Sequence, residues 1–199
     1  LLYQGNYPGA SGELEPNFKW PPGYDEAPQL EFDQTAKRDA INFIKNNPAE
    51  FIKLTLWRVS IYFSLARPTG FWFHLGGLGK IITLAASFFS TLILFIAGLA
   101  GAVLSMRKKL FNFENPAFYL ALMFIMLPLA IIAILVETRY RYPAYPLLAI
   151  FAGYGIFMIV RNWQTGWKPT LAVAALFIGN ALFDVSRNLA KVIERITNL

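Results

Sequence analysis

The sequence has no cysteine, only one histidine and few charged residues, 15% of its 199 positions. The absence of cysteine excludes disulfide bonds, thiolate metal sites and cysteine nucleophiles. His74 has neither a cysteine nor a pair of carboxylates near it, so no metal site is predicted there. No cofactor is assigned, and a requirement for a divalent metal stays open. Soluble domains have about a quarter of their residues charged, so this low charge, with 56% hydrophobic residues, predicts a membrane protein.

The net charge of +6 raises the question of an anionic partner. In a chain this apolar, basic residues meet lipid head groups or anionic lipid substrates more often than nucleic acid. We therefore predict membrane lipids as partners and no nucleic acid. The chain begins with Leu1. It has neither the charged amino-terminal region nor the small-residue cleavage site that are typical of a signal peptide. We expect it to be part of a longer chain.

Residues 1–34 are rich in proline and glycine and have no helical or strand period, which predicts a loop. Flexible linkers are polar and poor in aromatic residues. This segment instead contains five aromatic side chains over its first 24 positions: Tyr3, Tyr7, Phe18, Trp20 and Tyr24. We expect the loop to be ordered and to pack on the rest of the protein.

Two helices are predicted after this loop. The first begins at Gln34, has one apolar face and ends at "NNP"; the second begins at Pro48 and runs to about residue 66. The second is too short to cross a bilayer. Arg58 in its middle, next to Trp57, favours a position at the membrane interface or against other helices. Residues 35–80 are therefore predicted to be juxtamembrane. Three aromatic residues are expected at head-group depth: Phe71, Trp72 and Phe73.

Long uncharged runs dominate the remainder. Residues 81–105 carry no charge over twenty-five positions, enough to cross a bilayer with some tilt. Further spans are predicted at 116–136, 143–160 and 169–190, with an amphipathic extension after the last. The predicted fold is all-α: a fragment of a polytopic membrane protein with about four transmembrane helices in residues 81–199. Lysine and arginine near the spans are too evenly divided to choose an orientation.

A charged and aromatic cluster, "ETRYRYP", lies between two of these apolar runs at residues 137–143. Pro143 disfavours helix before it; in an extended segment Arg139 and Arg141 would project to the same side. In a helix, Glu137 and Arg141 would lie one turn apart and could pair. Either geometry offers a guanidinium group at the water boundary that suits the phosphate of a lipid carrier. The alternative is a set of interface anchors, with Glu137 as a structural counter-ion.

Two other features are weaker indications of a site. The stretch "GNYPGASG" at residues 5–12, which contains Asn6 and Tyr7, could be a ligand-binding turn because glycine allows close backbone approach, or an ordinary loop. Asp184 is an acid at the edge of the fourth predicted span, where charge is costly. Arg187 follows at i+3, and we predict that the two side chains pair.

Three stretches resemble the carboxyl-terminal half of bacterial membrane glycosyltransferases of the GT-C superfamily. This group includes the protein O-mannosyltransferases and the aminoarabinose transferase that modifies lipid A. "GNYPGASG" resembles an extracytoplasmic stretch of the family, with Tyr7 where asparagine is common. "AINFIKNNPAEFIKLTLWRVSIYF" resembles its paired helices, and "ETRYRYPAYPLLAIFAGYGI" resembles the start of a late span. Their shared order covers about 160 residues.

The resemblance implies a polyprenyl-phosphate-linked sugar donor and transfer on the extracytoplasmic face of the bacterial plasma membrane. Residues 1–80 and "ETRYRYP" would lie outside. Arg139 and Arg141 match the family motif and would bind the carrier phosphate, with Tyr140 beside them and Glu137 orienting them; Asn6 and Tyr7 would belong to a possible substrate loop. The family's catalytic aspartate lies in an amino-terminal half that this chain lacks, so no catalytic residue is predicted within it.

Three functions follow as hypotheses. The first is part of a membrane glycosyltransferase, whose partners are a lipid-linked donor, membrane lipids and a missing amino-terminal half or other membrane subunits. The second is a non-catalytic membrane subunit with a similar scaffold, which acts in assembly or lipid packing, because a fold does not guarantee an activity. A transporter is less favoured, because the spans lack paired broken helices and polar residues at the midplane.

Overall fold

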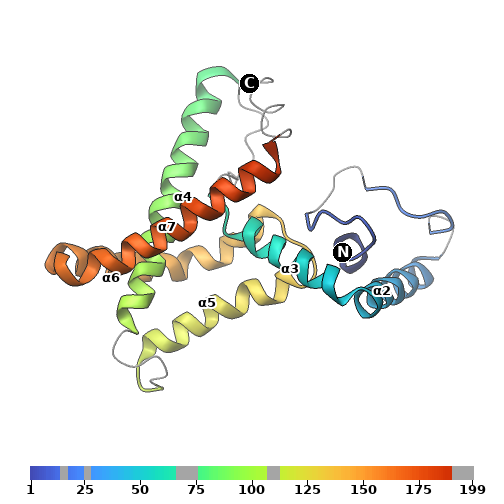
Figure 1. Ribbon diagram of the computed structural model, residues 1–199, viewed down its shortest axis with the longest axis horizontal. Helices are drawn as coiled ribbons and strands as arrows, with labels where there is room; N and C mark the ends of the chain where they lie inside the picture. Colours follow the sequence, from blue (N-terminus) through green and yellow to red (C-terminus); the bar gives the residue numbers. More distant parts are fainter. Residues whose placement is uncertain (14–17, 25–27, 66–75, 107–112, 190–199) are drawn as a thin grey trace. The chain divides into compact units, whose positions relative to one another are not determined.

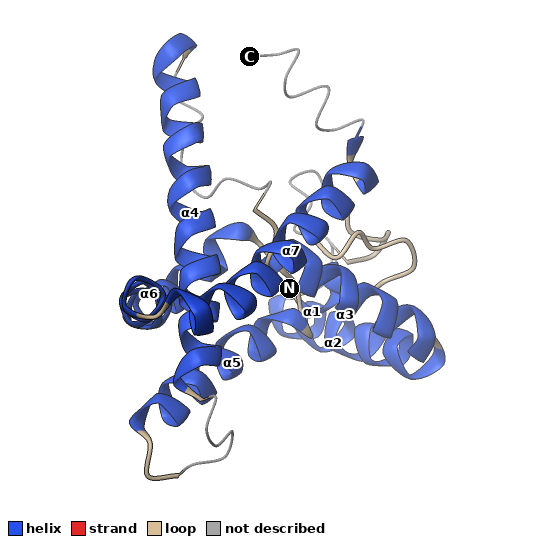
Figure 2. Ribbon diagram, turned by 60° about the vertical axis from the view of Figure 1, so that its left-hand side comes forward, coloured by secondary structure: helices blue, strands red, loops and turns tan. Residues whose placement is uncertain are grey.

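The computed structural model describes residues 1–13, 18–24, 28–65, 76–106 and 113–189. It divides into two compact units. Unit 1 comprises Leu1–Tyr62 and Leu129–Glu137, and unit 2 comprises Phe63–Pro128 and Thr138–Leu199. The regular elements of the described residues are helices (Figure 2), apart from one isolated parallel bridge between Glu13 and Val136. The predicted all-α class is confirmed for this part of the chain.

Unit 1 contains helices α1 (Leu2–Gly5), α2 (Gln29–Asn46) and α3 (Pro48–Tyr62); α2 and α3 are labelled in Figure 1 and α1 in Figure 2. α2 buries Ala36, Ala40 and Phe43, the apolar face expected from the sequence. The helix begins at Gln29, five residues before the predicted start, and α1 interrupts the predicted loop. Glu31 lies in the first turn of α2, where a negative charge favours the amino-terminal end of a helix.

The aromatic residues of the first loop form one cluster within unit 1. Tyr3 stacks between Tyr7 and Trp20, with ring centroids 5.9 and 5.7 Å away. Phe18 packs edge-on against Trp20 at 5.0 Å. Tyr24 is buried and donates a hydrogen bond to Asp39 Oδ2 on α2 at 2.6 Å. Burial and this hydrogen bond to the carboxylate raise the pKa of the Tyr24 hydroxyl. In the described part of the first loop, the aromatic side chains therefore pack on one another and, through Tyr24, on α2.

Unit 2 contains the long apolar helices. These are α4 (Gly77–Ser105), η2 (Thr138–Ala144), α6 (Tyr145–Arg161) and α7 (Trp163–Arg187), together with most of α5 (Pro116–Ile132). Three stretches are long and apolar enough to cross a membrane: Gly77–Ser105, Arg139–Arg161 and Gly166–Arg187. Only Asn162 separates α6 from α7, so much of the loop predicted there is helical. The predicted aromatic anchors at 71–73, residues 107–112 and the end of the chain from 190 lie outside the described residues.

The second predicted span, 116–136, differs from the structure. Its helix α5 is apolar but ends at Ile132, after 17 residues. At about 1.5 Å per residue it is roughly 26 Å long, short of a hydrocarbon core of about 30 Å. The next four residues belong to unit 1, where Val136 N–H donates to the Gly12 carbonyl at 3.4 Å. The described chain thus has three helices of spanning length and one shorter apolar helix.

Helices α4 and α6 pack closely because small residues line their contact. A β-carbon added at Gly101 would overlap the Phe151 carbonyl, and one at Gly155 would lie 2.5 Å from the Ala97 carbonyl oxygen. Close approach of backbones at small residues stabilises helix pairs in membranes, where apolar side chains gain little from leaving lipid. The glycines of α4 and α6 are therefore part of the folding pattern of unit 2.

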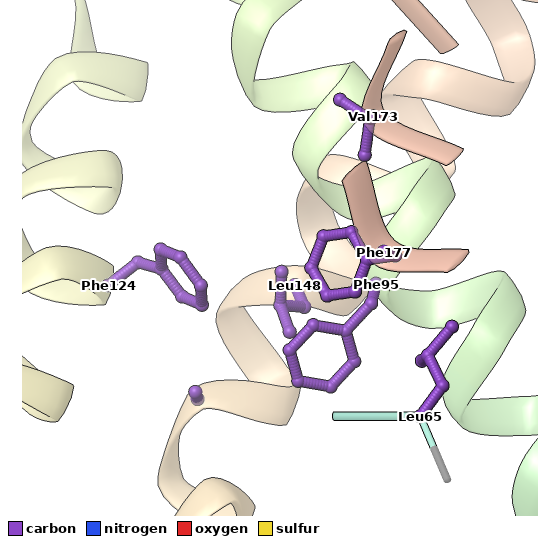
Figure 3. Close-up of a cluster of buried hydrophobic side chains, with 7 residues drawn as sticks. Leu65, Phe95, Phe124, Leu148, Val173 and Phe177 are labelled. Carbon is purple, nitrogen blue, oxygen red and sulfur yellow. The ribbon is translucent and has the colours of Figure 1, made fainter. Parts of the chain in front are cut away.

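The hydrophobic core of unit 2 lies where α4, α6 and α7 meet. Figure 3 shows Phe95, Leu148 and Phe177 side by side, with Phe124 of α5 in the same cluster. The rings of Phe95 and Phe177 have centroids 5.4 Å apart. This core positions the amino-terminal end of α6, which follows directly from the "ETRYRYP" segment.

Candidate functional site

Arg58 of α3 is fully buried in unit 1, and its guanidinium group donates to oxygen atoms from two distant segments. Nη1 donates to the carbonyls of Ile132 and Ala133, each at 3.2 Å. Nη2 donates to the Gly5 carbonyl and, at 3.0 Å, to Oδ1 of Asn6. In the described part of the chain, these partners are all uncharged oxygens. Arg58 therefore links α3, the first loop and the segment after α5.

Asn6 completes this arrangement from the opposite side. It is fully buried, and its Nδ2 donates to the Leu2 carbonyl at 2.9 Å, the Ile134 carbonyl at 3.3 Å and the Ala133 carbonyl at 3.4 Å. Its side chain thus accepts from Arg58 and donates to the same segment that Arg58 contacts. Asn6 was predicted to belong to a possible substrate loop, and the structure uses both ends of its amide within the protein.

The sequence favoured a position of this helix at the membrane interface or against other helices, and the burial of Arg58 fits the second alternative. Burial lowers the pKa of the Arg58 guanidinium to about 10, so the group stays protonated at neutral pH. A buried charge is costly unless hydrogen bonds satisfy it, and bonds that involve a charged donor are stronger than neutral ones. Four oxygens around Nη1 and Nη2 meet this requirement for the two terminal nitrogens, while Nε is buried without a hydrogen-bond partner among the described residues.

The "ETRYRYP" segment is helical, so the extended alternative was wrong. Thr138–Ala144 form the 3₁₀ helix η2, with Pro143 inside it. A 3₁₀ helix has three residues per turn, and residues two apart therefore point in different directions. Arg139 is exposed, whereas Arg141 is fully buried. The structure does not place the two arginines together on one surface.

Arg141 belongs to a buried polar cluster within unit 2. Its Nη1 donates to the Ser64 carbonyl at 2.7 Å. The Ser64 hydroxyl donates to Oδ2 of Asp184 at 2.7 Å, and Asn188 Nδ2 donates to Oδ1 at 3.1 Å. Asp184 is 3% exposed. This cluster connects η2, the residues after α3 and the end of α7, so Arg141 has a structural partner where a free phosphate-binding group was expected.

The remaining predicted site residues lie in different surroundings. Arg139 lies over the ring of Tyr140, with its Cζ 6.0 Å from the ring centroid. Tyr140 is half-buried. Glu137 is half-buried and is the last residue of unit 1. Tyr7 stacks in the aromatic cluster of the first loop. Arg139 with Tyr140 is the part of the predicted phosphate site that the structure leaves at the surface of unit 2.

Sequence reasoning missed two residues of these clusters. Arg58 was visible as a charge within an apolar helix, and such a residue indicates either an interface or a buried polar site. Ser64 gave no comparable signal, because a serine near the end of an apolar helix is common. Around these clusters, no group of three or more histidine, aspartate or glutamate side chains is placed to bind a metal within the described residues.

Comparison of the whole chain with protein-family models, with curated proteins and with solved structures found no match.

Proposed function

We propose that this chain is the carboxyl-terminal part of a membrane glycosyltransferase that uses a polyprenyl-phosphate-linked sugar. One observation supports this proposal most directly. Arg58, within the second family-like stretch, binds Gly5 and Asn6 of the first, and it also binds the segment that ends one residue before the third begins. Two of the family-like stretches, and the residues that precede the third, thus meet at one guanidinium group within unit 1.

In the proposed reaction, an acceptor oxygen attacks the anomeric carbon of the sugar. The bond between this carbon and the carrier phosphate oxygen breaks, the phosphate leaves with the electron pair, and the acceptor proton passes to a base. Positive groups near the phosphate stabilise the charge that develops on it. This chain would supply such a group, while the resemblance places the base, an aspartate, in the amino-terminal half.

Arg139 is the residue proposed to contact the carrier phosphate. It is exposed and carries five donors in a planar arrangement that matches phosphate oxygens. Tyr140 lies beneath the guanidinium group and restricts its position. Arg141 acts from the interior, because its bond to the Ser64 carbonyl holds η2 in place. In this proposal, the segment lies on the extracytoplasmic side of a bacterial plasma membrane.

The test is binding of polyprenyl phosphate to the chain in lipid nanodiscs, compared with the uncharged polyprenol. The phosphate form should bind more tightly, and Arg139→Gln should weaken its binding about tenfold, which corresponds to a charged hydrogen bond of about 1.4 kcal/mol. Arg161→Gln is the matched control, because Arg161 is also exposed and lies over an aromatic ring, that of Phe157, at the other end of α6. Equal affinity for the alcohol, or an unchanged affinity in Arg139→Gln, would contradict the proposal.

The burial of Arg141 favours a second candidate, a non-catalytic membrane subunit built on the same scaffold. A residue that is fully buried and bonded to Ser64 serves the packing of unit 2 whether or not a lipid donor binds. The same experiment separates the two functions. A subunit would bind polyprenol and polyprenyl phosphate alike, without dependence on Arg139.

A further inference from the structure

The first loop is shaped to receive the Arg58 side chain. A β-carbon at Gly5 would overlap the Ile134 carbonyl and lie 3.2 Å from Arg58 Nη2. The backbone of Gly12 has φ +83°, a value that residues other than glycine rarely adopt. A β-carbon there would lie 3.3 Å from Arg58 Cγ. The two glycines that bracket "GNYPGASG" therefore let its backbone approach one particular arginine.

The segment after α5 is held by the same group. The carbonyls of Ile132 and Ala133 accept hydrogen bonds from Arg58 Nη1. Those of Ala133 and Ile134 accept hydrogen bonds from Asn6 Nδ2. A helix that ends leaves its last carbonyls without partners in the helix itself. Arg58 and Asn6 supply donors to these carbonyls, which explains why the chain leaves the helix there and continues to Glu137.

Only arginine matches this set of acceptors. The guanidinium group is planar, with two terminal nitrogens that each donate in two directions, whereas lysine has a single nitrogen. The acceptors of Nη1 lie in residues 132 and 133, and those of Nη2 lie in residues 5 and 6. A lysine nitrogen at one of these positions would not reach the other pair of oxygens. Among the described residues, only the Ala133 carbonyl of these four oxygens has a further donor, Asn6 Nδ2.

We infer that Arg58 is a positioning residue of unit 1, which holds the "GNYPGASG" loop against residues 132–136. A role of this loop in binding the lipid-linked donor rests on the proposed function. Asn6 shares this role, since its amide bonds within the same cluster. The inference assigns both residues to the arrangement of the site, and neither to contact with substrate.

The experiment measures the distance between the loop and the segment. Because the chain has no cysteine, spin labels can be placed specifically at Ser11→Cys and Ile134→Cys, both in unit 1. The wild-type background should give one narrow distance distribution, which Arg58→Gln and Arg58→Lys broaden. Arg38→Gln, which removes an exposed arginine of α2, is the control and should leave it narrow. An unchanged distribution in both Arg58 variants would overturn the inference.

Polyprenyl phosphate binding gives a second readout. Arg58→Lys should raise the Kd about tenfold, the scale of effect expected from a small misplacement, while the binding stoichiometry stays the same. A residue needed only for folding would instead lower the stoichiometry and leave the Kd unchanged, which would contradict a positioning role. If the wild-type chain binds no polyprenyl phosphate, the proposed function fails, and the spin-label distances alone decide the role of Arg58.

Discussion

Asn6 and Arg58 are fully buried side chains, 52 positions apart in the sequence, that meet where Arg58 Nη2 donates to Asn6 Oδ1 at 3.0 Å. Both also bond to the Ala133 carbonyl. Neither residue is paired with a carboxylate in the described part of the chain, so the arrangement depends on amide and carbonyl oxygens. Such buried polar clusters are sensitive to the loss of a single member, because the partners that remain lack a hydrogen bond.

Asn6→Ala should lower the free energy of unfolding by about 1–3 kcal/mol, because it leaves buried hydrogen-bonding groups without a partner. Unfolding can be followed by denaturant titration in detergent micelles. The control is Asn42→Ala, which removes an exposed asparagine of α2. Similar stability of the two variants would show that the Asn6 amide is not needed in the cluster.

Gly101→Ala should destabilise the contact between α4 and α6. The added methyl group would overlap the Phe151 carbonyl, and overpacking of this kind costs about 1–3 kcal/mol. Gly153→Ala is the matched control on α6, since a β-carbon there has no atom within 4 Å. Melting temperatures in the same detergent provide the measurement. A loss of stability in Gly153→Ala as large as that in Gly101→Ala would argue against the close packing.

Ser64→Ala should destabilise unit 2 by about 1–3 kcal/mol, because Asp184 loses a buried donor at 2.7 Å. Ser90→Ala serves as the control, because Ser90 is exposed and its hydroxyl bonds only within α4, to the Ser87 carbonyl. A double-mutant cycle with Asp184→Asn should give a coupling energy of about 0.5–3 kcal/mol. Additive effects of the two substitutions would mean that the hydroxyl and the carboxylate do not interact.

The outer face of α3 should lie in the membrane interface. Ile52 and Leu56 are 58% and 63% exposed and lie one turn apart, and Lys53 lies over the Trp57 ring at 4.7 Å. Helices with an exposed apolar stripe flanked by lysine and tryptophan lie at the boundary of head groups and acyl chains. A spin label at Leu56→Cys should collide with oxygen more often than with a water-soluble nickel complex, and a label at Lys37→Cys on α2 should show the reverse. Preferential access of nickel to residue 56 would contradict the prediction.

The packing of the first loop could be predicted in part from the sequence, whereas the surroundings of Arg58 and Arg141 could not. The aromatic residues of the first loop, such as Tyr3 and Trp20, indicated an ordered segment. The burial of several large rings is favourable in free energy, so they are not expected to remain in solvent. Arg141 was expected at the water boundary and Arg58 at the membrane interface or against other helices, and both are fully buried. Their surroundings could not be predicted, since the carbonyls that bind them come from residues more than 50 positions away.

The sequence by itself determined the membrane class and the helical fold, because uncharged runs of twenty or more residues satisfy their backbone hydrogen bonds in lipid only as helices or closed barrels. It also determined the helix ends near Pro48 and the ordered aromatic loop. Only the tertiary structure decided that α5 ends at Ile132, that Arg139 is exposed and that Arg58 and Arg141 are buried. A guanidinium group needs several oxygens at fixed directions, and those oxygens come together only when distant segments pack.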